Sequence, residues 1–378
     1  MKILIICHKS ILKPLDGGSV ASKKIYLDLK KNYDTDVICL NNKKDNITEN
    51  DFNYNIKKKF SLLKLTKSLF SVNSYQADRF YSRNISKKIT TIINKKKYEY
   101  ILFEGVFPAV YLEDIQKKCN CKTIIRTHNI EHEIWNDLIK NNDNIFKKFI
   151  YFFIKKQIKK WEDYICKKSD FLCCISKNDS QYFNKLINKN VIVLPVSFKV
   201  NESKINNIFS IFHLGSMDWK PNIEGVNWFI EKVWKKFEIE KMPVYCYFAG
   251  KNMPEKIKIK STDKLIIEST IIDAKKYMQN KSVMIVPIFS GSGIRIKILE
   301  GMSLGIPIIS TTKGAKGIPY INGKNILIAD NEIDFYNKIK KLHTNSELYK
   351  KISLEGKKLI ENNFSTEKVI KQWNKIIF

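Results

Sequence analysis

The residues most suited to chemistry lie between 286 and 311, in the stretch VPIFSGSGIRIKILEGMSLGIPIIST. An apolar run predicts a buried strand that ends at Ile288, and a short run of serine and glycine then predicts the opening of a helix. The amides of such a run, together with the positive end of the helix, bind phosphate groups. The run consists of Ser290, Gly291, Ser292 and Gly293.

Three charged residues follow on the predicted helix. Arg295 and Lys297 add cationic donors beside the phosphate cradle. Glu300 lies about two turns into the helix, where its carboxylate could accept hydrogen bonds from the diol of a ribose. The alternative is a helix that begins with glycines and carries these charges on its solvent face. We favour a nucleotide-diphosphate site, because the glycines, the cations and the carboxylate all suit one ligand.

A pair of glycines follows the first predicted strand. Gly17 and Gly18 lie between a strand that ends near Cys7 and a helix predicted to begin near Ser19. Paired glycines let a backbone approach a ligand closely. A loop that needs glycine only for its own turn would have the same residues.

The stretch IIRTHNIEHEIW, residues 124–135, delivers polar side chains to the carboxyl end of a strand, where ligands bind in open α/β sheets. His128 could donate a hydrogen bond to a sugar hydroxyl or move a proton, and Arg126 and Asn129 could contact a sugar. The alternative is a capped strand end in which His128 is satisfied locally. His128 and His132 are four residues apart, but the pattern is not H-E-x-x-H and lacks a third ligand, so we expect no metal.

A further polar loop lies within residues 210–230, SIFHLGSMDWKPNIEGVNWFI. The pattern predicts a strand over 211–214, a loop that contains Gly215 and Ser216, and then a helix. The first strand-to-helix loop of a doubly wound domain is a usual ligand-binding edge, although an ordinary connecting loop is an equal alternative.

Short apolar runs alternate with longer amphipathic runs along the 378 residues. Such apolar runs are typical of strands buried on both faces of a parallel sheet, and the helical runs between them indicate doubly wound α/β domains. A polar segment near 199–208 divides the chain into predicted domains 1–199 and 200–364. Residues 365–378 have apolar positions at helical spacing, which predicts a helix with one apolar face. The predicted strands are 3–7, 36–40, 100–104, 123–127, 171–176, 191–196, 211–214, 244–248, 265–268, 283–288, 307–310 and 326–328.

The net charge is +29, from 67 Lys and Arg against 38 Asp and Glu. Such a charge attracts polyanions, although a lysine-rich composition would raise it without any function. Nucleic acid is not the expected partner, because lysine is spread along the whole chain and no nucleic-acid-binding signature is present.

The eight cysteines suit a reducing compartment, and no apolar run approaches the roughly 20 residues of a membrane span. We therefore expect a cytoplasmic protein, with any membrane association peripheral, on the inner face of the cytoplasmic membrane.

Two segments, 57–70 and 146–161, combine lysine with large apolar residues. Both patterns predict basic amphipathic helices, which can lie on an anionic membrane surface or pack their apolar face on a sheet. We favour the membrane surface for 57–70 and packing on the first domain for 146–161.

Together these stretches resemble the family 4 glycosyltransferases of the GT-B fold. GSMDWKPNIEGVNWF is similar to a subgroup with a G-S-M-x-W-x-P-N block, and SGSGIRIKILEGMSLGIPIIST is similar to the donor-site signature. The resemblance implies two Rossmann-like domains that face each other across a cleft, with the nucleotide-sugar donor held mainly by the second. It also implies a terminal helix that crosses back onto the first domain. Transfer is expected to retain anomeric configuration and to need no metal or other cofactor.

The resemblance also implies roles for individual residues. His128 is expected near the reacting sugar and Glu300 at the ribose, and these two are the candidate catalytic residues. The remaining residues expected to bind the donor are Gly17, Gly18, Gly215, Ser216, Ser290, Gly291, Ser292, Gly293, Arg295 and Lys297.

This sequence departs from the family pattern at two places. Many members carry E-x7-E, whereas here Ser292 replaces the first carboxylate and Glu300 keeps the second. Ser216 stands where an arginine is usual, and Lys220 matches the usual lysine only loosely. We therefore expect Arg295 and Lys297 to supply that positive charge.

The expected acceptor is a glycan or a lipid-linked acceptor in cell-surface polysaccharide or glycoconjugate synthesis. Three alternatives remain open at this point. They are a sugar-nucleotide 2-epimerase of the same architecture, a catalytically inactive family member, and a non-enzymatic polyanion-binding protein.

Overall fold

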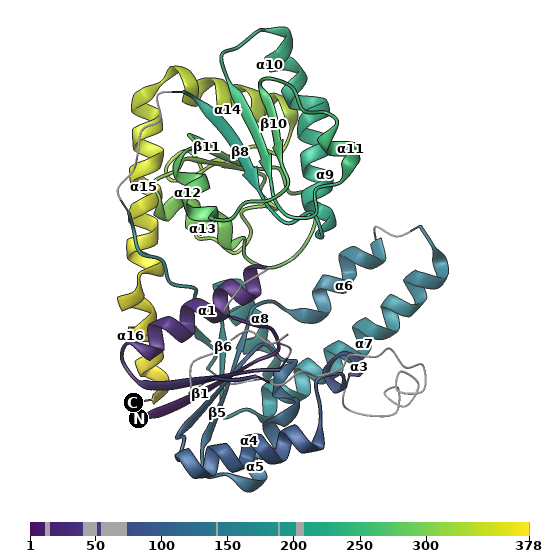
Figure 1. Ribbon diagram of the computed structural model, residues 1–378, viewed down its shortest axis with the longest axis vertical. Helices are drawn as coiled ribbons and strands as arrows, with labels where there is room; N and C mark the ends of the chain where they lie inside the picture. Colours follow the sequence, from purple (N-terminus) through teal and green to yellow (C-terminus); the bar gives the residue numbers. More distant parts are fainter. Residues whose placement is uncertain are drawn as a thin grey trace. The chain divides into compact units, whose positions relative to one another are not determined.

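The computed structural model describes residues 1–11, 16–40, 51–53, 74–140, 143–187, 190–201 and 208–377. The chain forms two compact units, coloured along the sequence in Figure 1. The first unit contains residues 1–197 and 369–378, and the second contains residues 198–368.

A parallel sheet lies at the centre of the first unit, and its seven strands within the described residues have the order β3-β2-β1-β4-β5-β6-β7. This order places a topological switch point between β1 and β4, where ligands bind in open α/β sheets. The strands are β1 Lys2–Cys7, β2 Asp34–Cys39, β3 Asp51–Asn53, β4 Tyr100–Glu104, β5 Lys122–Thr127, β6 Phe171–Cys174 and β7 Ile192–Val193.

Helices cover both faces of this sheet, which explains the unbroken apolar runs of its strands. Side chains alternate between the two faces, so Leu4 and Ile6 join one core while Ile3 and Ile5 join the other. On the first face lie α4 Arg83–Lys96, α5 Leu112–Lys118, the second half of α7 Ile145–Lys168, and α8 Lys177–Ile187. On the second face lie α1 Gly17–Lys30 and α16 Thr366–Ile377. The short α3 Tyr75–Asp78 and η1 Pro108–Tyr111, and α6 Glu131–Lys140, complete the unit.

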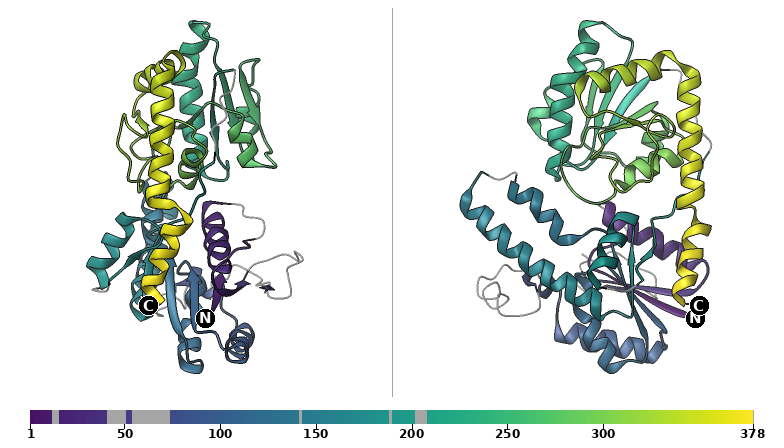
Figure 2. Two further views of the ribbon diagram at one scale, coloured as in Figure 1. Left: turned by 90° about the vertical axis from the view of Figure 1, so that its left-hand side faces the viewer. Right: turned by 180° about the vertical axis from the view of Figure 1, so that it is seen from behind.

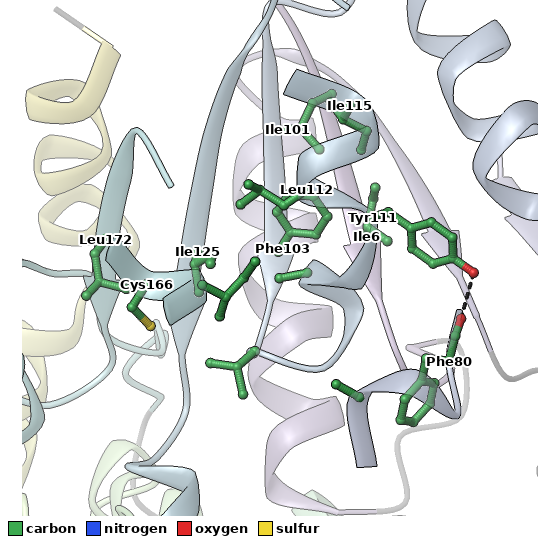
Figure 3. Close-up of a cluster of buried hydrophobic side chains, with 14 of the residues drawn as sticks. Ile6, Phe80, Ile101, Phe103, Tyr111, Leu112, Ile115, Ile125, Cys166 and Leu172 are labelled. Carbon is green, nitrogen blue, oxygen red and sulfur yellow. Dashed lines mark hydrogen bonds between the residues drawn. The ribbon is translucent and has the colours of Figure 1, made fainter. Parts of the chain in front are cut away.

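The core on the first face contains a buried tyrosine, shown in Figure 3. Tyr111 packs with Phe103 and Leu112, and its hydroxyl donates a hydrogen bond of 2.6 Å to the carbonyl oxygen of Phe80. The buried hydroxyl is therefore satisfied, and the bond ties the segment after α3 to η1.

Helix α16 completes the core on the second face. Val369, Trp373 and Ile376 belong to the same buried cluster as side chains of β1, β2 and β4. The hydroxyl of Tyr33 donates to Oδ1 of Asn374 at 2.6 Å. Both ends of the described chain therefore lie on the first unit, as Figures 1 and 2 show.

The second unit repeats the same strand order in a parallel sheet whose described strands run β10-β9-β8-β11-β12-β13. Its switch point lies between β8 and β11. The strands are β8 Ser210–Leu214, β9 Tyr245–Ala249, β10 Leu265–Glu268, β11 Val283–Val286, β12 Ile308–Ser310 and β13 Leu327–Ile328. The helices are α9 Lys220–Trp228, the π-helix η2 Phe229–Trp234, α10 Lys235–Ile239, α11 Glu255–Lys258, α12 Ala274–Gln279, α13 Ile296–Ser303, α14 Glu332–Thr344 and α15 Ser346–Phe364.

The predicted α/β fold class and both doubly wound sheets are confirmed. Each predicted strand is present, although 191–196 is reduced to β7, and β3 was not predicted.

The expectation that 146–161 packs on the first domain is wrong for its first part. Residues 145–147, 149–150 and 152–153 are exposed, and full burial begins only at Ile158. The segment 57–70 lies outside the described residues. No helix that the structure describes is both long enough and apolar enough to span a membrane.

Candidate functional site

In the first unit, three neighbouring strands bring polar residues to one edge of the sheet. β4 pairs with β1 on one side and with β5 on the other. Glu104, the last residue of β4, lies directly opposite Arg126 of β5 in the strand register. His128 follows β5 immediately after its last residue. A carboxylate, a guanidinium group and an imidazole therefore meet at the carboxyl end of the sheet.

Glu104 is the centre of this group and is only 1% exposed. Nη1 of Arg126 donates to both carboxylate oxygens of Glu104, at 3.1 and 3.0 Å. Nε2 of His128 lies 2.8 Å from Oε2 of the same carboxylate. Burial alone would raise the pKa of Glu104, but the charges of Arg126 and His128 outweigh it and lower the pKa to about 2. Glu104 is therefore ionised, and because a carboxylate only accepts hydrogen bonds, Nε2 of His128 carries the proton between the two groups.

Arg126 has a different role from the sugar contact that the sequence suggests. Its side chain is fully buried. Nε and Nη2 donate to the carbonyl oxygens of Leu194 and Pro195, at 2.9 and 3.2 Å, while Nη1 donates to Glu104. All three nitrogens are thus bonded within the protein, and Arg126 positions Glu104. Asn129, by contrast, is half-buried just beyond His128.

The other ring nitrogen of His128 faces the start of α1. A Cβ atom on Gly18 would lie 3.3 Å from Nδ1, so the missing side chain leaves room beside the ring. Gly17 and Gly18 are the first residues of α1, which begins earlier than predicted because Asp16 caps it. The Asp16 carboxylate accepts a hydrogen bond of 2.9 Å from the amide of Ser19. The predicted glycine pair thus opens a helix beside His128.

The second histidine of the RTHNIEHEIW stretch is structural. Nδ1 of His132 lies 2.6 Å from Oε2 of Glu162, a fully buried residue of α7. The other oxygen of Glu162 accepts a hydrogen bond of 2.7 Å from the amide of Glu131. Glu162 therefore ties the start of α6 to α7. Within the described ranges, no group of three His, Cys, Asp or Glu side chains is placed to hold a metal ion.

In the second unit, the loops after β8 and β11 meet, because these two strands are neighbours at the switch point. Gly291 and Gly293 have φ values of +96° and +81°, which favour glycine. A Cβ atom on Gly291 would lie 2.5 Å from the ring of Trp219. The guanidinium group of Arg295 lies over that ring, 4.6 Å from its centroid. Trp219, from the first loop, therefore packs against both the glycine and the arginine of the second.

Arg295 also closes the second loop on itself. Its Nη1 donates to the carbonyl oxygens of Ser292 and Gly293, at 2.6 and 2.7 Å. It is the N-cap residue of α13, which begins at Ile296, so the predicted helix opening at the serine and glycine run was placed too early. Ser292 has a buried Oγ for which the described residues offer no hydrogen-bond partner.

Lys297 and Glu300 lie one turn apart on α13. Nζ of Lys297 is 2.8 Å from Oε2 of Glu300, and their side chains are 37% and 21% exposed. A cation and a carboxylate are thus presented together, and both are accessible to a ligand. Ser290, at the start of the loop, donates from Oγ to Glu224 of α9 at 3.3 Å.

Gly215 and Ser216 shape the loop after β8. A Cβ atom on Gly215 would lie 2.5 Å from Nδ2 of Asn222, and that nitrogen donates to the carbonyl oxygen of Ser216 at 2.7 Å. The Ser216 hydroxyl donates to Asp218 at 3.0 Å. Gly215 is therefore needed for close packing, and Ser216 for the local turn.

The structure thus gathers the predicted residues into two groups, one in each unit. Sequence reasoning missed Glu104 and Trp219. A carboxylate at the end of an otherwise apolar strand is a signal that points to Glu104. Trp219 lies in the polar loop predicted within residues 210–230, but its position in the sequence does not indicate a contact with Arg295.

Residues 209–345 match the family described as Glycosyl transferases group 1. A protein of Klebsiella pneumoniae, described as an uncharacterized 44.6 kDa protein in the cps region, is 26% identical over 284 residues, which are 72% of this chain and 73% of that protein. Sucrose-phosphate synthase from Thermosynechococcus elongatus has a similar structure, with a TM-score of 0.72 at 12% identity over 100% of this chain and 98% of that chain. Anabaena HepE in complex with UDP gives a TM-score of 0.68 at 12% identity over 100% and 99% of the two chains. HepE has also been solved with UDP-glucose.

Proposed function

We propose that this chain, whose residues 209–345 match the group 1 glycosyltransferases and whose fold is GT-B, transfers a sugar from a UDP-sugar to a glycan or lipid-linked acceptor. The proposal of a uridine donor is supported by HepE, which binds UDP and UDP-glucose. A role in polysaccharide synthesis is supported by the relative in the cps region. The observation that carries the proposal is the loop of residues 290–295, held by Arg295 at the edge of the second sheet.

The second unit is proposed to bind the donor through this loop and α13. The amides of the loop and the start of α13 would receive the diphosphate. Arg295 keeps the loop closed through two carbonyl oxygens and adds positive charge beside it. Lys297 would exchange its contact with Glu300 for a diphosphate oxygen, and Glu300 would then be free to bind the ribose hydroxyls. Cationic side chains and the helix end would stabilise the departing diphosphate without a metal ion.

The first unit is proposed to contribute His128 to the same reaction. Because Glu104 holds a proton on Nε2, the neutral form of the imidazole would present an unprotonated Nδ1 beside Gly18. Nδ1 would therefore accept a hydrogen bond from a hydroxyl of the donor sugar, whereas the sequence suggested that His128 donates one. Transfer with retention is proposed from the family resemblance.

A nucleotide screen tests the donor site. UDP, GDP, ADP and CMP are added separately to the protein and to Glu300→Ala, and binding is followed by thermal shift and calorimetry. We expect UDP to stabilise the protein selectively. We expect Glu300→Ala to weaken UDP binding by about 10- to 100-fold, because two hydrogen bonds to a charged group are lost. Glu255→Ala, which removes an exposed carboxylate of α11, is the matched control.

Two outcomes would contradict the proposal. Absence of binding by all four nucleotides would exclude an active donor site. Equal binding by Glu300→Ala and the unaltered protein would remove Glu300 from it. With a labelled UDP-sugar and acceptor, the product distinguishes transfer from epimerisation, which releases or isomerises the sugar without an acceptor.

A further inference from the structure

The first part of α7 exposes an apolar surface that the fold does not use. Further along the same helix, Trp161 and Ile165 are buried in the core of the first unit, as is expected of a helix that covers a sheet. Between residues 145 and 153, large apolar side chains are instead 38% to 78% exposed. These side chains are Ile145, Phe146, Phe149, Ile150, Phe152 and Phe153. A contiguous apolar surface of this kind marks an interaction site.

Helix α6 does not cover this surface. α6 and α7 lie side by side and extend beyond the sheet of the first unit, as Figures 1 and 2 show. The two helices meet through other residues, such as Trp135 and the half-buried Tyr151, whose ring centroids are 5.6 Å apart. On the exposed side, the rings of Phe149 and Phe153 meet edge to face, with their centroids 4.6 Å apart.

Within this segment of α7, all the charged side chains are basic. Residues 145–160 contain six lysines and no acidic residue. Nζ of Lys156 lies 4.6 Å from the centroid of the Phe152 ring, so the cationic and apolar parts are contiguous. Lys156 and Lys160 continue the face of Phe149 and Phe152 at helical spacing, and Lys156 follows Phe149 by about 10 Å along the axis.

This arrangement suits the boundary of a lipid bilayer. Interfacial helices bury their apolar face roughly 5–10 Å into the boundary between headgroups and acyl chains. The lysines of the same helix would then be attracted to the anionic headgroups. Docking of a second copy by the same face would bring six lysines against six, which is unfavourable.

We propose that residues 145–160, the α7 tip, dock the protein on an anionic lipid surface. The aromatic side chains insert at the membrane interface, and the lysines bind lipid phosphates. This docking is a property of the first unit and does not depend on the sugar transfer proposed above.

Vesicle flotation of the full chain tests the proposal. The probes are vesicles of phosphatidylcholine alone and vesicles that also contain phosphatidylglycerol. We expect binding to the anionic vesicles and a decrease as salt is raised. The double variant Phe146→Ser/Phe149→Ser is expected to weaken binding at least about tenfold through the loss of apolar burial. Lys156→Glu/Lys160→Glu is expected to abolish the preference for anionic vesicles.

Matched variants separate docking from general effects. Ile333→Ser removes an exposed apolar side chain of α14, and Lys350→Glu/Lys351→Glu reverses two exposed charges of α15. Both are expected to bind vesicles as the unaltered protein does. All variants should keep the same thermal unfolding and the same UDP binding, since the changed residues are exposed. Unchanged vesicle binding by both α7 variants would overturn the proposal, as would dimers that Phe146→Ser/Phe149→Ser dissociates while vesicles are not bound.

Discussion

Glu104 is a buried charge that holds Arg126 and His128 in place. Replacement by glutamine keeps the shape of the side chain and leaves the buried guanidinium group of Arg126 without a counter-charge. We expect Glu104→Gln to lower the free energy of unfolding by about 3–5 kcal/mol, as measured by chemical denaturation. The exposed Glu255→Gln should change it little. A loss below about 1 kcal/mol for Glu104→Gln would show that the pair is not needed.

The acid response of the protein follows from the same carboxylate. The folded-state pKa of Glu104 is about 2, below the value of about 4.3 for an unfolded glutamate. The stabilisation from this group is therefore present above about pH 4.3 and is lost as the pH falls toward 2. The unfolding free energy of Glu104→Gln should fall less steeply over that window than that of the unaltered protein. Parallel slopes would contradict this assignment.

For single residues, the sequence indicated candidates whose residue type is unusual at its position. It did not indicate residues whose role depends on pairing with a side chain of another strand. His128 was proposed because polar residues after a strand lie at the binding edge of a sheet, and Gly18 because paired glycines let a backbone approach a ligand. The pairing of Glu104 with Arg126 depends on β4 lying next to β5 in register, which residue types do not reveal. The burial of Arg126 follows from that pairing, so its role was misassigned.

The conformation of the loop between β11 and α13 requires two glycines with positive φ, Gly291 and Gly293. Gly291→Ala places a methyl group at φ +96° and against the Trp219 ring, so it should displace the loop. We expect at least about tenfold weaker UDP binding by calorimetry, together with lower stability. Gly323→Ala is the control, because Gly323 has φ +76° and its Cβ atom would meet no atom within 4 Å. That variant should lose roughly 1–2 kcal/mol of stability without any change in UDP binding. Equal UDP affinities in the two variants would show that the loop is not part of the site.

Strands were predicted well because burial on both faces produces unbroken apolar runs, whereas helix boundaries depend on local geometry. α1 begins early because Asp16 caps it, and α13 begins late because Gly291 and Gly293 are left-handed. The sequence shows glycine but not the sign of φ. β3 consists of only three residues, which is too short for a periodic signal.

Helix α16 makes the stability of the first unit depend on residues from the far end of the chain. Trp373 is fully buried in a cluster that includes residues of β1 and β2, so Trp373→Ala should lower the stability of the first unit by about 3–5 kcal/mol. Its Nε1 has no hydrogen-bond partner among the described residues, so Trp373→Phe should cost much less. Hydrogen exchange of β1 and β2 measures this loss, while UDP binding by the second unit should persist. Equal exchange in the two variants would contradict the packing role.

The division of the chain was predicted near 199–208, and the compact units divide at residues 197 and 198. The predicted division rests on the polar segment that follows the last strand of the first sheet. Only the family resemblance implied that the terminal helix packs on the first domain. The amphipathic pattern indicates that one face of the helix is covered, but not which sheet covers it.

The return of α16 to the first sheet also sets an order of events during synthesis. The first unit is interrupted by the 171 residues from 198 to 368, so its second core face stays open while they are translated. At about 5–20 residues per second, this wait lasts roughly 9 to 34 s. Throughout that time, the apolar side chains that will meet Trp373 are uncovered on the nascent chain. The first unit to leave the ribosome is therefore the last to be completed, and a chaperone that binds apolar surface has its longest opportunity there.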